Sequence, residues 1–346
     1  MQPKTTITPL ILELISEIDE FKGKWKALSQ LTPDRLRGLK RIATIESIGS
    51  STRIEGVKLS DQEVERLLSG LQKTSFRSRD EEEVAGYAEA IEMVFESFEN
   101  IPLTENHIQQ LHGALLKYST KDQRHRGYYK KFPNHVEAFD SRKKSLGVIF
   151  QTASPFETPQ RMKELVDWTK QSLEQKTLHP LLLIAIFLVH FLAIHPFQDG
   201  NGRLSRILTT LLLLRHGYSY VPYSSMEHLI EENKDQYYLA LRRAQSTLKA
   251  DDSQLNEWIL FFLKTLKKQK DILTRKVDVE KSMFRLSPLS QEILRLAQEH
   301  GRITNAAIQS VTGSNRNTVK ATLEKLVKEE RLIRHGKKKG TGYTLK

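Results

Sequence analysis

The apolar run from Leu181 to Ile194 constrains the fold of this chain more than any other feature. It is 14 residues long and contains His190, whereas a membrane-spanning helix needs about 20 predominantly apolar residues. The run is therefore predicted to be a helix buried in the core of a domain, and no membrane partner is expected. His190 lies about 140° around that helix from His195, so we expect it to pack in the core rather than to share a metal with His195.

Helical spacing of apolar residues dominates the remainder of the chain, and the fold class is predicted to be mainly α. The segment from Asp34 is expected to form a helix that ends at Gly56, a residue suited to the position after a helix. Ser60 and Glu63 have the spacing of a capping box, which predicts the start of the next helix at Asp61. Further helices are expected at about 80–99, 104–117, 158–174, 179–194, 202–216, 225–246 and 252–272.

The segment from Gly127 to Pro155 departs from this helical pattern. It contains two short β-like runs, HVEAF and SLGVIF, on either side of Asp140-Ser141-Arg142, and we interpret it as a hairpin flap inserted among helices. The charged stretch 267–284 lacks a strong apolar stripe and is interpreted as a connector. The predicted divisions are an N-terminal helical region at 1–100, a core at 101–250, a helical connector at 251–284 and a separate domain at 285–346.

Charge is unevenly distributed between these parts. The 346 residues, enough for about two to three domains, include 54 Lys and Arg against 42 Asp and Glu, a net charge of +12. From 285 to 346 there are 13 basic and five acidic residues, so two thirds of the positive excess lies in this tail. A basic segment of this kind indicates a polyanionic partner.

The chain has no cysteine, which excludes disulfides, thiolate metal sites and a cysteine nucleophile. This composition fits a reducing cytosol. Acidic residues appear too early in the N-terminal segment for the apolar region of a signal peptide. A cytoplasmic protein is therefore expected.

A polar loop follows the apolar run and reads His195-Pro196-Phe197-Gln198-Asp199-Gly200-Asn201-Gly202-Arg203-Leu204-Ser205-Arg206. Pro196 disfavours helical backbone at the preceding residue, so the helix is expected to end at His195 with its imidazole projecting from the terminus. Gly200 and Gly202 allow successive backbone N–H groups to converge on an anion at the start of the next helix, where the helix dipole also favours phosphate. Phe197 is expected to point into the core.

Charged side chains in the loop add to this anion site. Arg203 and Arg206 are three residues apart and share one face of the first helical turn, so both can bind phosphate oxygens. Asp199 is a hard oxygen ligand suited to a Mg²⁺ that bridges phosphates. The loop therefore predicts a phosphate site with an associated metal.

The loop resembles the signature of the Fic family, HPFx(D/E)GNGRxxR, at every defined position. The resemblance implies a protein adenylyltransferase, which transfers AMP from ATP to a hydroxyl side chain of a target protein, or of itself, and releases pyrophosphate. It implies His195 as the general base and Asp199 as the ligand of Mg²⁺. The ATP-binding residues that it implies are Gly200, Asn201, Gly202, Arg203, Leu204, Ser205 and Arg206.

Weaker resemblances to the family extend over about residues 35 to 245. The segments RGYYKKFPNHV and ASPFETPQRMKELVDWT resemble the family's flap, which implies that a target segment carrying Ser, Thr or Tyr docks in β-strand fashion at about 127–155. The chain departs from the family pattern at Ser154-Pro155, where a proline pair is usual, and at Lys130, where an arginine is common.

A further segment, EENKDQYYLAL, resembles the part of the family that lines the nucleotide base. This implies Asn233 as an ATP-binding residue, with Tyr237 or Tyr238 as a second candidate. Helix packing is the alternative role for the two tyrosines.

The segment Ser51-Thr52-Arg53-Ile54-Glu55-Gly56 matches the inhibitory motif (S/T)xxxE(G/N) found in many of these proteins. Ser51 and Glu55 are four residues apart and share one face of a helix. The resemblance implies that the Glu55 carboxylate forms a bidentate pair with Arg206 and occupies the place of the ATP γ-phosphate. The alternative is a helix C-terminus with exposed charges.

The basic tail has the pattern of three helices followed by a glycine-containing hairpin, and it resembles a winged helix-turn-helix. Ile303-Thr304 is expected to start the second helix, and Ser314 is expected to cap the third. Asn315, Arg316, Asn317, Thr318 and Lys320 would contact bases and phosphates of DNA, and Lys337–Lys339 in the wing would lie near phosphates. The alternative is a solvated module for dimer or target contacts.

Together these features predict an autoinhibited protein adenylyltransferase that uses ATP and Mg²⁺, with possible DNA binding through 285–346 and a possible homodimer. The rival is a DNA-binding regulator whose Fic core senses nucleotide without turnover. The intact set of His195, Asp199, Arg203 and Arg206 argues against a degenerate core.

Overall fold

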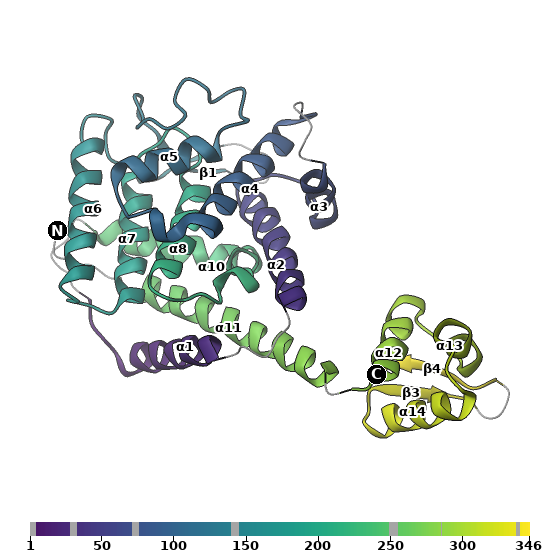
Figure 1. Cartoon of the computed structure of the whole chain (residues 1–346). Helices are drawn as coiled ribbons and strands as arrows, with labels where there is room; N and C mark the ends of the chain where they lie inside the picture. Colours follow the sequence, from purple (N-terminus) through teal and green to yellow (C-terminus); the bar gives the residue numbers. More distant parts are fainter. Residues whose placement is uncertain are drawn as a thin grey trace. The chain divides into compact units, whose positions relative to one another are not determined.

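The computed structural model describes residues 5–27, 33–70, 76–139, 145–248, 255–284, 286–336 and 340–346. The chain divides into two compact units, Met1–Leu273 and Thr274–Lys346. Both are mainly helical, as predicted (Figure 1). The helices of the first unit are α1 (Pro9–Ala27), α2 (Pro33–Ile54), α3 (Asp61–Ser69), α4 (Arg79–Ser97), α5 (Glu105–Leu115), α6 (Thr158–Glu174), α7 (Pro180–Ile194), α8 (Asn201–Arg215), α9 (Met226–Glu232), α10 (Lys234–Thr247) and the greater part of α11 (Asn256–Phe284).

Helices α7 and α8 form the centre of the first unit. Nearly every residue of α7 from Leu181 onward is buried, His190 being half-buried, and α7 packs against α6 and α8. The indole N–H of Trp258 donates to the carbonyl oxygen of Ala185 at 2.7 Å, so α11 also contacts this helix. The predicted buried core helix is therefore confirmed. Within the described residues, no helix is both long and apolar enough to cross a bilayer.

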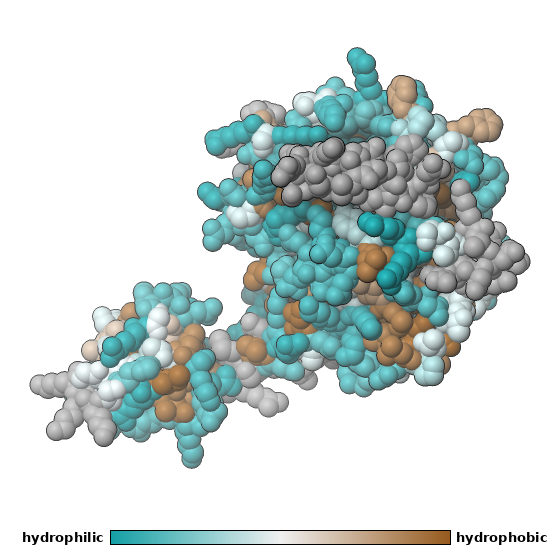
Figure 2. Space-filling model, turned by 180° about the vertical axis from the view of Figure 1, so that it is seen from behind, coloured by the Kyte–Doolittle hydropathy of each residue, from teal (hydrophilic) through white to brown (hydrophobic). Residues whose placement is uncertain are grey.

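Hydrophilic residues cover most of the face of the molecule that Figure 2 presents. Exposed apolar residues form smaller groups among them, as is usual for a folded surface.

Helix α2 ends close to the predicted position. Its last helical residue is Ile54, and Gly56 follows with a φ of +106°, a left-handed conformation that glycine adopts readily. The backbone N–H of Gly56 donates to the Arg53 carbonyl at 3.0 Å. The predicted capping box begins α3: Ser60 N–H donates to Glu63 Oε2 at 2.8 Å, and Glu63 N–H donates to Ser60 Oγ at 3.4 Å.

Two predicted boundaries are wrong. The single helix expected at 225–246 is divided into α9 and α10 at Asn233, whose side-chain amide donates to the Leu229 carbonyl at 2.7 Å. The helix expected at 252–272 continues to Phe284 as α11, through the stretch that was interpreted as a connector. Its buried Leu266, Leu273 and Val277 keep helical spacing, so an apolar stripe is present although charged residues surround it.

The predicted hairpin consists of β1 (His135–Phe139) and β2 (Ser145–Gln151), which pair antiparallel. His135 pairs with Gln151 and Ala138 with Gly147, and the register shifts twice between His135 and the turn. The expected turn at Asp140-Ser141-Arg142 lies outside the described residues.

The second unit contains α12 (Pro288–His300), α13 (Asn305–Thr312), α14 (Arg316–Lys328) and the antiparallel strands β3 (Leu332–His335) and β4 (Gly342–Leu345). Its core gathers residues from all five elements, among them Ile293, Ile308, Leu323, Leu332 and Tyr343. The backbones of Ile303 and Tyr343 form a β-bridge that joins the hairpin to the segment before α13. Three helices and a two-stranded hairpin are the predicted winged-helix arrangement.

Two details of the second unit concern the predicted DNA-contacting residues. The cap of α14 is Asn315 and not Ser314, because the Asn315 side chain accepts the Asn317 N–H at 2.9 Å. Residues 315–318 and Lys320 are exposed at the start of this helix. Lys337–Lys339 lie outside the described residues.

Candidate active site and its inhibitory contact

His195 follows the last residue of α7 and has left-handed backbone angles, with φ 53° and ψ 61°. Pro196 accounts for this exit from the helix, as predicted, while the backbone N–H of His195 still donates to the Phe191 carbonyl at 2.9 Å. Burial, assisted by the nearby charge of Lys130, lowers the pKa of His195 to about 4. The imidazole is therefore neutral at pH 7 and can accept a proton.

The side chain of Asn201 holds the loop in shape. Its Oδ1 accepts the Phe197 backbone N–H at 2.9 Å, and its Nδ2 donates to the Phe197 carbonyl at 2.7 Å. The Phe197 ring is fully buried, as expected, and stacks on the imidazole of His112 with 3.8 Å between ring centroids. The Asn201 amide is thus used by the loop itself, and the Gly200 backbone N–H donates to Asp199 Oδ1 at 2.6 Å.

Two glycines open the start of α8. Gly200 has a φ of +80° and is the residue that precedes the helix. A Cβ atom at Gly202 would collide with the carboxylate of Glu55. An anionic group, this carboxylate, therefore lies where the sequence predicts a phosphate.

Arg203 is buried and points toward α4. Its Nη1 donates to Glu83 Oε2 at 2.7 Å, and its Nη2 lies 3.3 Å from Asp199 Oδ1. The second carboxylate oxygen of Asp199 accepts from Arg79 at 3.2 Å. Nε of Arg203 has no hydrogen-bond partner within the described part of the chain. Glu83 and Arg79 were not predicted, because nothing near them in sequence identifies them.

Arg206 connects α8 to the predicted inhibitory motif. Its Nε donates to Ser51 Oγ at 2.7 Å, and its Nη2 donates to the Ser51 carbonyl and to Glu55 Oε1, both at 2.8 Å. The expected bidentate pair is wrong: Arg206 makes one hydrogen bond to the carboxylate and uses its Nε for the serine. The two motif residues therefore share one guanidinium.

Charge keeps this partly buried contact ionised. Burial raises the pKa of the Glu55 carboxyl, but the charge of Arg206 and the hydrogen bond from it lower the pKa by more. Burial likewise lowers the pKa of Arg206, but the charge of Glu55, with Tyr237, Tyr87 and the hydrogen bond to Glu55, together raise the pKa above its ordinary value. Both groups are charged at neutral pH, so an anion that replaces Glu55 must also be charged to satisfy Arg206.

His112 in α5 is a residue that the sequence did not identify. Its Nδ1 accepts the Gly127 backbone N–H at 3.0 Å, so its Nε2 carries the proton that it shares with the Asp199 carbonyl at 3.0 Å. Burial lowers the pKa of His112 to about 4, which keeps this arrangement in its neutral form. His112 positions the loop and, through Gly127, the first residue of the predicted flap.

Lys130 joins the same two segments. Its backbone N–H donates to the Pro196 carbonyl at 2.8 Å. Its Nζ lies within hydrogen-bond distance of the Ile194 carbonyl, at 3.1 Å, and of the side chains of Asn134 and Thr152, at 2.7 and 2.9 Å. Burial lowers the pKa of Lys130 to about 8. The lysine at this position thus ties the base of the hairpin to the residues around His195.

The segment predicted to line the nucleotide base begins at Asn233, whose amide is used in the break between α9 and α10. Tyr237 is buried and packs against Tyr238, Trp258 and Phe261. These contacts correspond to the alternative role, helix packing.

The side chains of the remaining predicted ATP-binding residues, Leu204 and Ser205, make contacts within the protein. Leu204 is fully buried, and Ser205 Oγ donates to the Gly202 carbonyl at 2.7 Å. The Leu204 backbone N–H also donates within the helix, to the Gly200 carbonyl at 2.8 Å.

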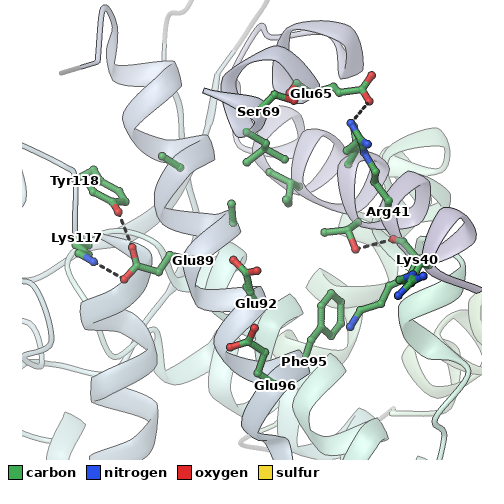
Figure 3. A pocket seen from close by; sticks show the side chains of 17 residues that line it. Lys40, Arg41, Glu65, Ser69, Glu89, Glu92, Phe95, Glu96, Lys117 and Tyr118 are labelled. Atoms are coloured by element: carbon green, nitrogen blue, oxygen red, sulfur yellow. Dashed lines mark hydrogen bonds and ion pairs between the residues drawn. The ribbon is translucent and has the colours of Figure 1, made fainter. Parts of the chain in front are cut away.

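A separate open hollow of about 800 Å³ lies along the N-terminal part of α2, between α2, α3 and α4 (Figure 3). Arg41 bridges to Glu65 at 2.9 Å across it, and Lys117 bridges to Glu89 at 2.5 Å on its other side. None of the residues predicted for catalysis, ATP binding or inhibition lines this hollow. The candidate active site is therefore the region around Gly202 and not this hollow.

Comparison with known proteins agrees with this geometry. Residues 102–213 match the Fic/DOC family, and residues 286–332 match the winged helix-turn-helix DNA-binding family. The protein adenylyltransferase Fic of Drosophila mojavensis is 25% identical over 304 residues, which cover 87% of this chain and 53% of that protein. A probable protein adenylyltransferase of Aquifex aeolicus is 32% identical over 99 residues, 29% of this chain and 28% of that protein. The chain spans about half of the first relative and less of the second.

Solved structures extend the likeness to the whole chain. A Fic family protein from Desulfovibrio desulfuricans G20 is 25% identical, with a TM-score of 0.64 over 100% of this chain and 98% of that one. A Fic domain containing signaling protein from Bacteroides thetaiotaomicron is 27% identical, with a TM-score of 0.57 over 73% of this chain and 96% of that one. The predicted Fic fold with a C-terminal winged helix is confirmed.

Proposed function

Because residues 102–213 form a Fic/DOC family domain and residues 286–332 a winged helix-turn-helix, we propose that this chain is an autoinhibited protein adenylyltransferase. The observation that carries the proposal is the position of a neutral His195 beside the glycines at the start of α8. A base at one side of an anion site is what nucleotidyl transfer to a hydroxyl requires.

In the proposed reaction, the hydroxyl oxygen of the target attacks the α-phosphorus of ATP. His195 accepts the hydroxyl proton, a new P–O bond forms to the target, and the bond between the α-phosphorus and the bridging oxygen breaks, so that pyrophosphate leaves. Backbone N–H groups from Gly200 to Gly202 and the helix dipole of α8 bind the phosphates. Arg203 and Arg206 orient them and stabilise the charge that develops.

Asp199 fits the role of a Mg²⁺ ligand. Mg²⁺ is usually held by one or two carboxylates together with substrate phosphates. The Asp199 carboxylate, which directly precedes Gly200, is partly exposed; it accepts the Gly200 N–H at 2.6 Å and has contacts of 3.2 and 3.3 Å to two arginines. When bound, Mg²⁺ would supply charge neutralisation on the phosphate oxygens. In the structure, Arg79 and Arg203 orient the Asp199 carboxylate.

Inhibition is assigned to Ser51 and Glu55. ATP and the Glu55 carboxylate would compete for the space over Gly202 and for Nη2 of Arg206, so ATP binds productively when the carboxylate has left. Gly56 allows the chain to turn directly after Glu55. This arrangement supports an enzyme whose ground state is inactive.

The target is proposed to dock along the hairpin at 127–155 by strand pairing. β1 and β2 are joined to the active-site loop through Lys130, so a segment on the hairpin would present its hydroxyl near His195. Self-modification would use the same site. A homodimer and a cytoplasmic location stay predictions.

The test is transfer of label from [α-³²P]ATP by wild type, Glu55→Gly and His195→Ala/Glu55→Gly, with bacterial lysate and with the protein alone. Glu55→Gly is expected to label at least tenfold more product than wild type, because Arg206 is then free for phosphate. His195→Ala in that background is expected to abolish labelling. The control is His228→Ala in the same Glu55→Gly background, because His228 is an exposed histidine of α9. This double variant is expected to label as much product as Glu55→Gly alone.

If neither wild type nor Glu55→Gly transferred any label, the proposal would be refuted. It would favour the rival, a DNA-binding regulator with a nucleotide-sensing core, for which a Kd for ATP without turnover is the expected finding.

We also propose that the second unit binds DNA. Its support is the exposed start of α14, where Arg316, Asn317 and Lys320 are free of the core and would face a major groove. The alternative is a contact module for a target or a second copy, for which no binding to a DNA duplex is expected.

A further inference from the structure

The pattern (S/T)xxxE(G/N) leaves three residues of the inhibitory motif unspecified, and Arg53 is the middle one. It precedes Glu55 by two positions and so points about 160° away from it around α2. Its Nε and Nη2 donate to the two carboxylate oxygens of Glu231 at 2.7 and 3.0 Å, and its Nη1 donates to Asp61 Oδ1 at 2.8 Å. We call these three residues the Arg53 cluster.

The cluster connects the end of α2 to two other helices. Glu231 belongs to α9, and Asp61 is the first residue of α3. Arg53 Nη1 also donates to the Leu59 carbonyl at 3.1 Å, in the segment that leaves α2. The cluster therefore fixes the helix on one side while Ser51 and Glu55 contact Arg206 on the other.

Gly49 makes room for the cluster. It lies one turn before Arg53 in α2, and a Cβ atom there would come within 2.5 Å of Asp61 Oδ1 and 2.6 Å of Arg53 Nη1, distances that real Cβ atoms do not show. Glycine is otherwise unfavourable inside a helix. Its presence at this point is explained by the space that the two charged groups need.

A second cation fixes the same helix end. Nζ of Lys234, the first residue of α10, donates to the Ile54 carbonyl at 2.6 Å. Glu231 and Lys234 lie on either side of Asn233, so the segment resembling the family's nucleotide-base lining is also the segment that holds the end of α2.

We propose that Arg53 is a positioning residue that sets the strength of inhibition, because it holds the last turn of α2 where Glu55 reaches Arg206. This rests on the proposed adenylyltransferase function. Glu55 lies in the turn after the last helical residue, so its place depends on how firmly that turn is held. Loss of the cluster would let the turn move and raise the fraction of molecules in which the carboxylate has left Arg206.

The structure also supplies a matched control. Arg41 and Glu65 form another ion pair between α2 and α3, at 2.9 Å, about three turns before Arg53 and more exposed. Arg41→Ala removes a salt bridge between the same two helices without touching the motif. If loss of any ion pair between α2 and α3 raised the rate of AMP transfer, both Arg41→Ala and Arg53→Ala would show the increase. The proposed role of Arg53 predicts the increase in Arg53→Ala only.

The experiment measures the rate of AMP transfer by the full chain with [α-³²P]ATP. Arg53→Ala is expected to label about three- to tenfold faster than wild type, and Arg53→Lys, which keeps the charge but loses the paired contact with Glu231, less than that. Arg41→Ala is expected to match wild type. Arg53→Ala combined with Glu55→Gly is expected to match Glu55→Gly alone, because no carboxylate then remains to be held.

Gly49→Ala gives an independent reading. Alanine favours helix over glycine, yet its Cβ would push Asp61 and Arg53 apart, so faster labelling is expected despite the better helix former. If Arg53→Ala does not fold, as judged by its thermal melting curve, Gly49→Ala and Glu231→Gln decide.

The outcomes separate the two proposals. One outcome overturns only the role of Arg53. In it, Glu55→Gly is active, but the single variants Arg53→Ala, Gly49→Ala and Glu231→Gln each label at the wild-type rate. An increase that is equal in Arg41→Ala, or that adds fully to the effect of Glu55→Gly, also overturns it. An inactive Glu55→Gly refutes the proposed function itself.

Discussion

Oε1 of Glu55 lies 2.8 Å from Nη2 of Arg206, and the same carboxylate occupies the space over Gly202. The two partners are 151 residues apart in the chain. Their contact places a negative group on an arginine and a glycine site that are suited to phosphate. The proposed inhibition is competition for one anion site, and it needs no distortion of His195.

Ser51→Ala should release inhibition in part. The substitution removes the acceptor of Arg206 Nε, while the contact from Nη2 to Glu55 and to the carbonyl of residue 51 remains. AMP transfer is expected at a rate between those of wild type and Glu55→Gly, measured with labelled ATP. A rate equal to that of Glu55→Gly would show that the serine, and not the carboxylate, is the main restraint.

The pH dependence of Glu55→Gly should extend to unusually low pH. A general base must be neutral, and burial lowers the pKa of His195 from 6.5 to about 4. The value of kcat/KM, which reports the free enzyme, is therefore expected to be level from about pH 6 to 8 and to fall below about pH 5. Removal of the Glu55 charge lowers this pKa further. An acid limb centred near 6.5 would contradict the assignment.

His112→Ala should reduce both stability and activity. The variant loses two hydrogen bonds, to Gly127 and Asp199, and the stacked contact with Phe197. Removal of a buried side chain with these contacts is expected to lower the free energy of unfolding by about 2–4 kcal/mol, measured by thermal or urea melting.

The loop that His112 positions also carries His195, the proposed catalytic base, so labelling in the Glu55→Gly background is expected to fall at least tenfold. His228→Ala, an exposed histidine, should change the free energy of unfolding by less than about 0.5 kcal/mol. Normal labelling by a stable His112→Ala would remove its role in positioning the loop.

Binding of DNA through α14 should depend strongly on salt. The affinity for a mixed-sequence duplex, measured by fluorescence anisotropy between about 50 and 200 mM salt, is expected to fall as counterions are released. Arg316→Ala with Lys320→Ala should weaken binding and reduce the salt slope by about one for each phosphate that the protein no longer neutralises. Lys163→Ala, an exposed lysine of α6, is the control. Absent or salt-independent binding would contradict the proposed binding of DNA by α14.

Sequence was most informative where function depends on consecutive residues. The loop from His195 to Arg206 and the motif from Ser51 to Gly56 each carry their spacing in one segment, so their elements were predicted with the correct ends to within a few residues. Ser60 and Glu63 identified a helix start for the same reason.

Residues that act through distant contacts were missed. His112 reaches the active-site loop across 87 residues, Glu83 reaches Arg203 across 120, and Arg53 reaches Glu231 across 178. Each stands in an ordinary helical sequence, and its partner is set by the packing of helices. The continuation of α11 was missed because its few apolar residues, such as Leu273 and Val277, are outnumbered by charges.

The lack of a side chain at Gly202 constrains how this protein can change during evolution. Any side chain there would displace the Glu55 carboxylate and so remove the proposed inhibition, but it would also fill the space proposed for a phosphate. Regulation and turnover therefore cannot be separated at this position. A lineage that loses the proposed inhibition while it keeps activity would have to do so through α2, whose residues are not among those proposed to bind ATP.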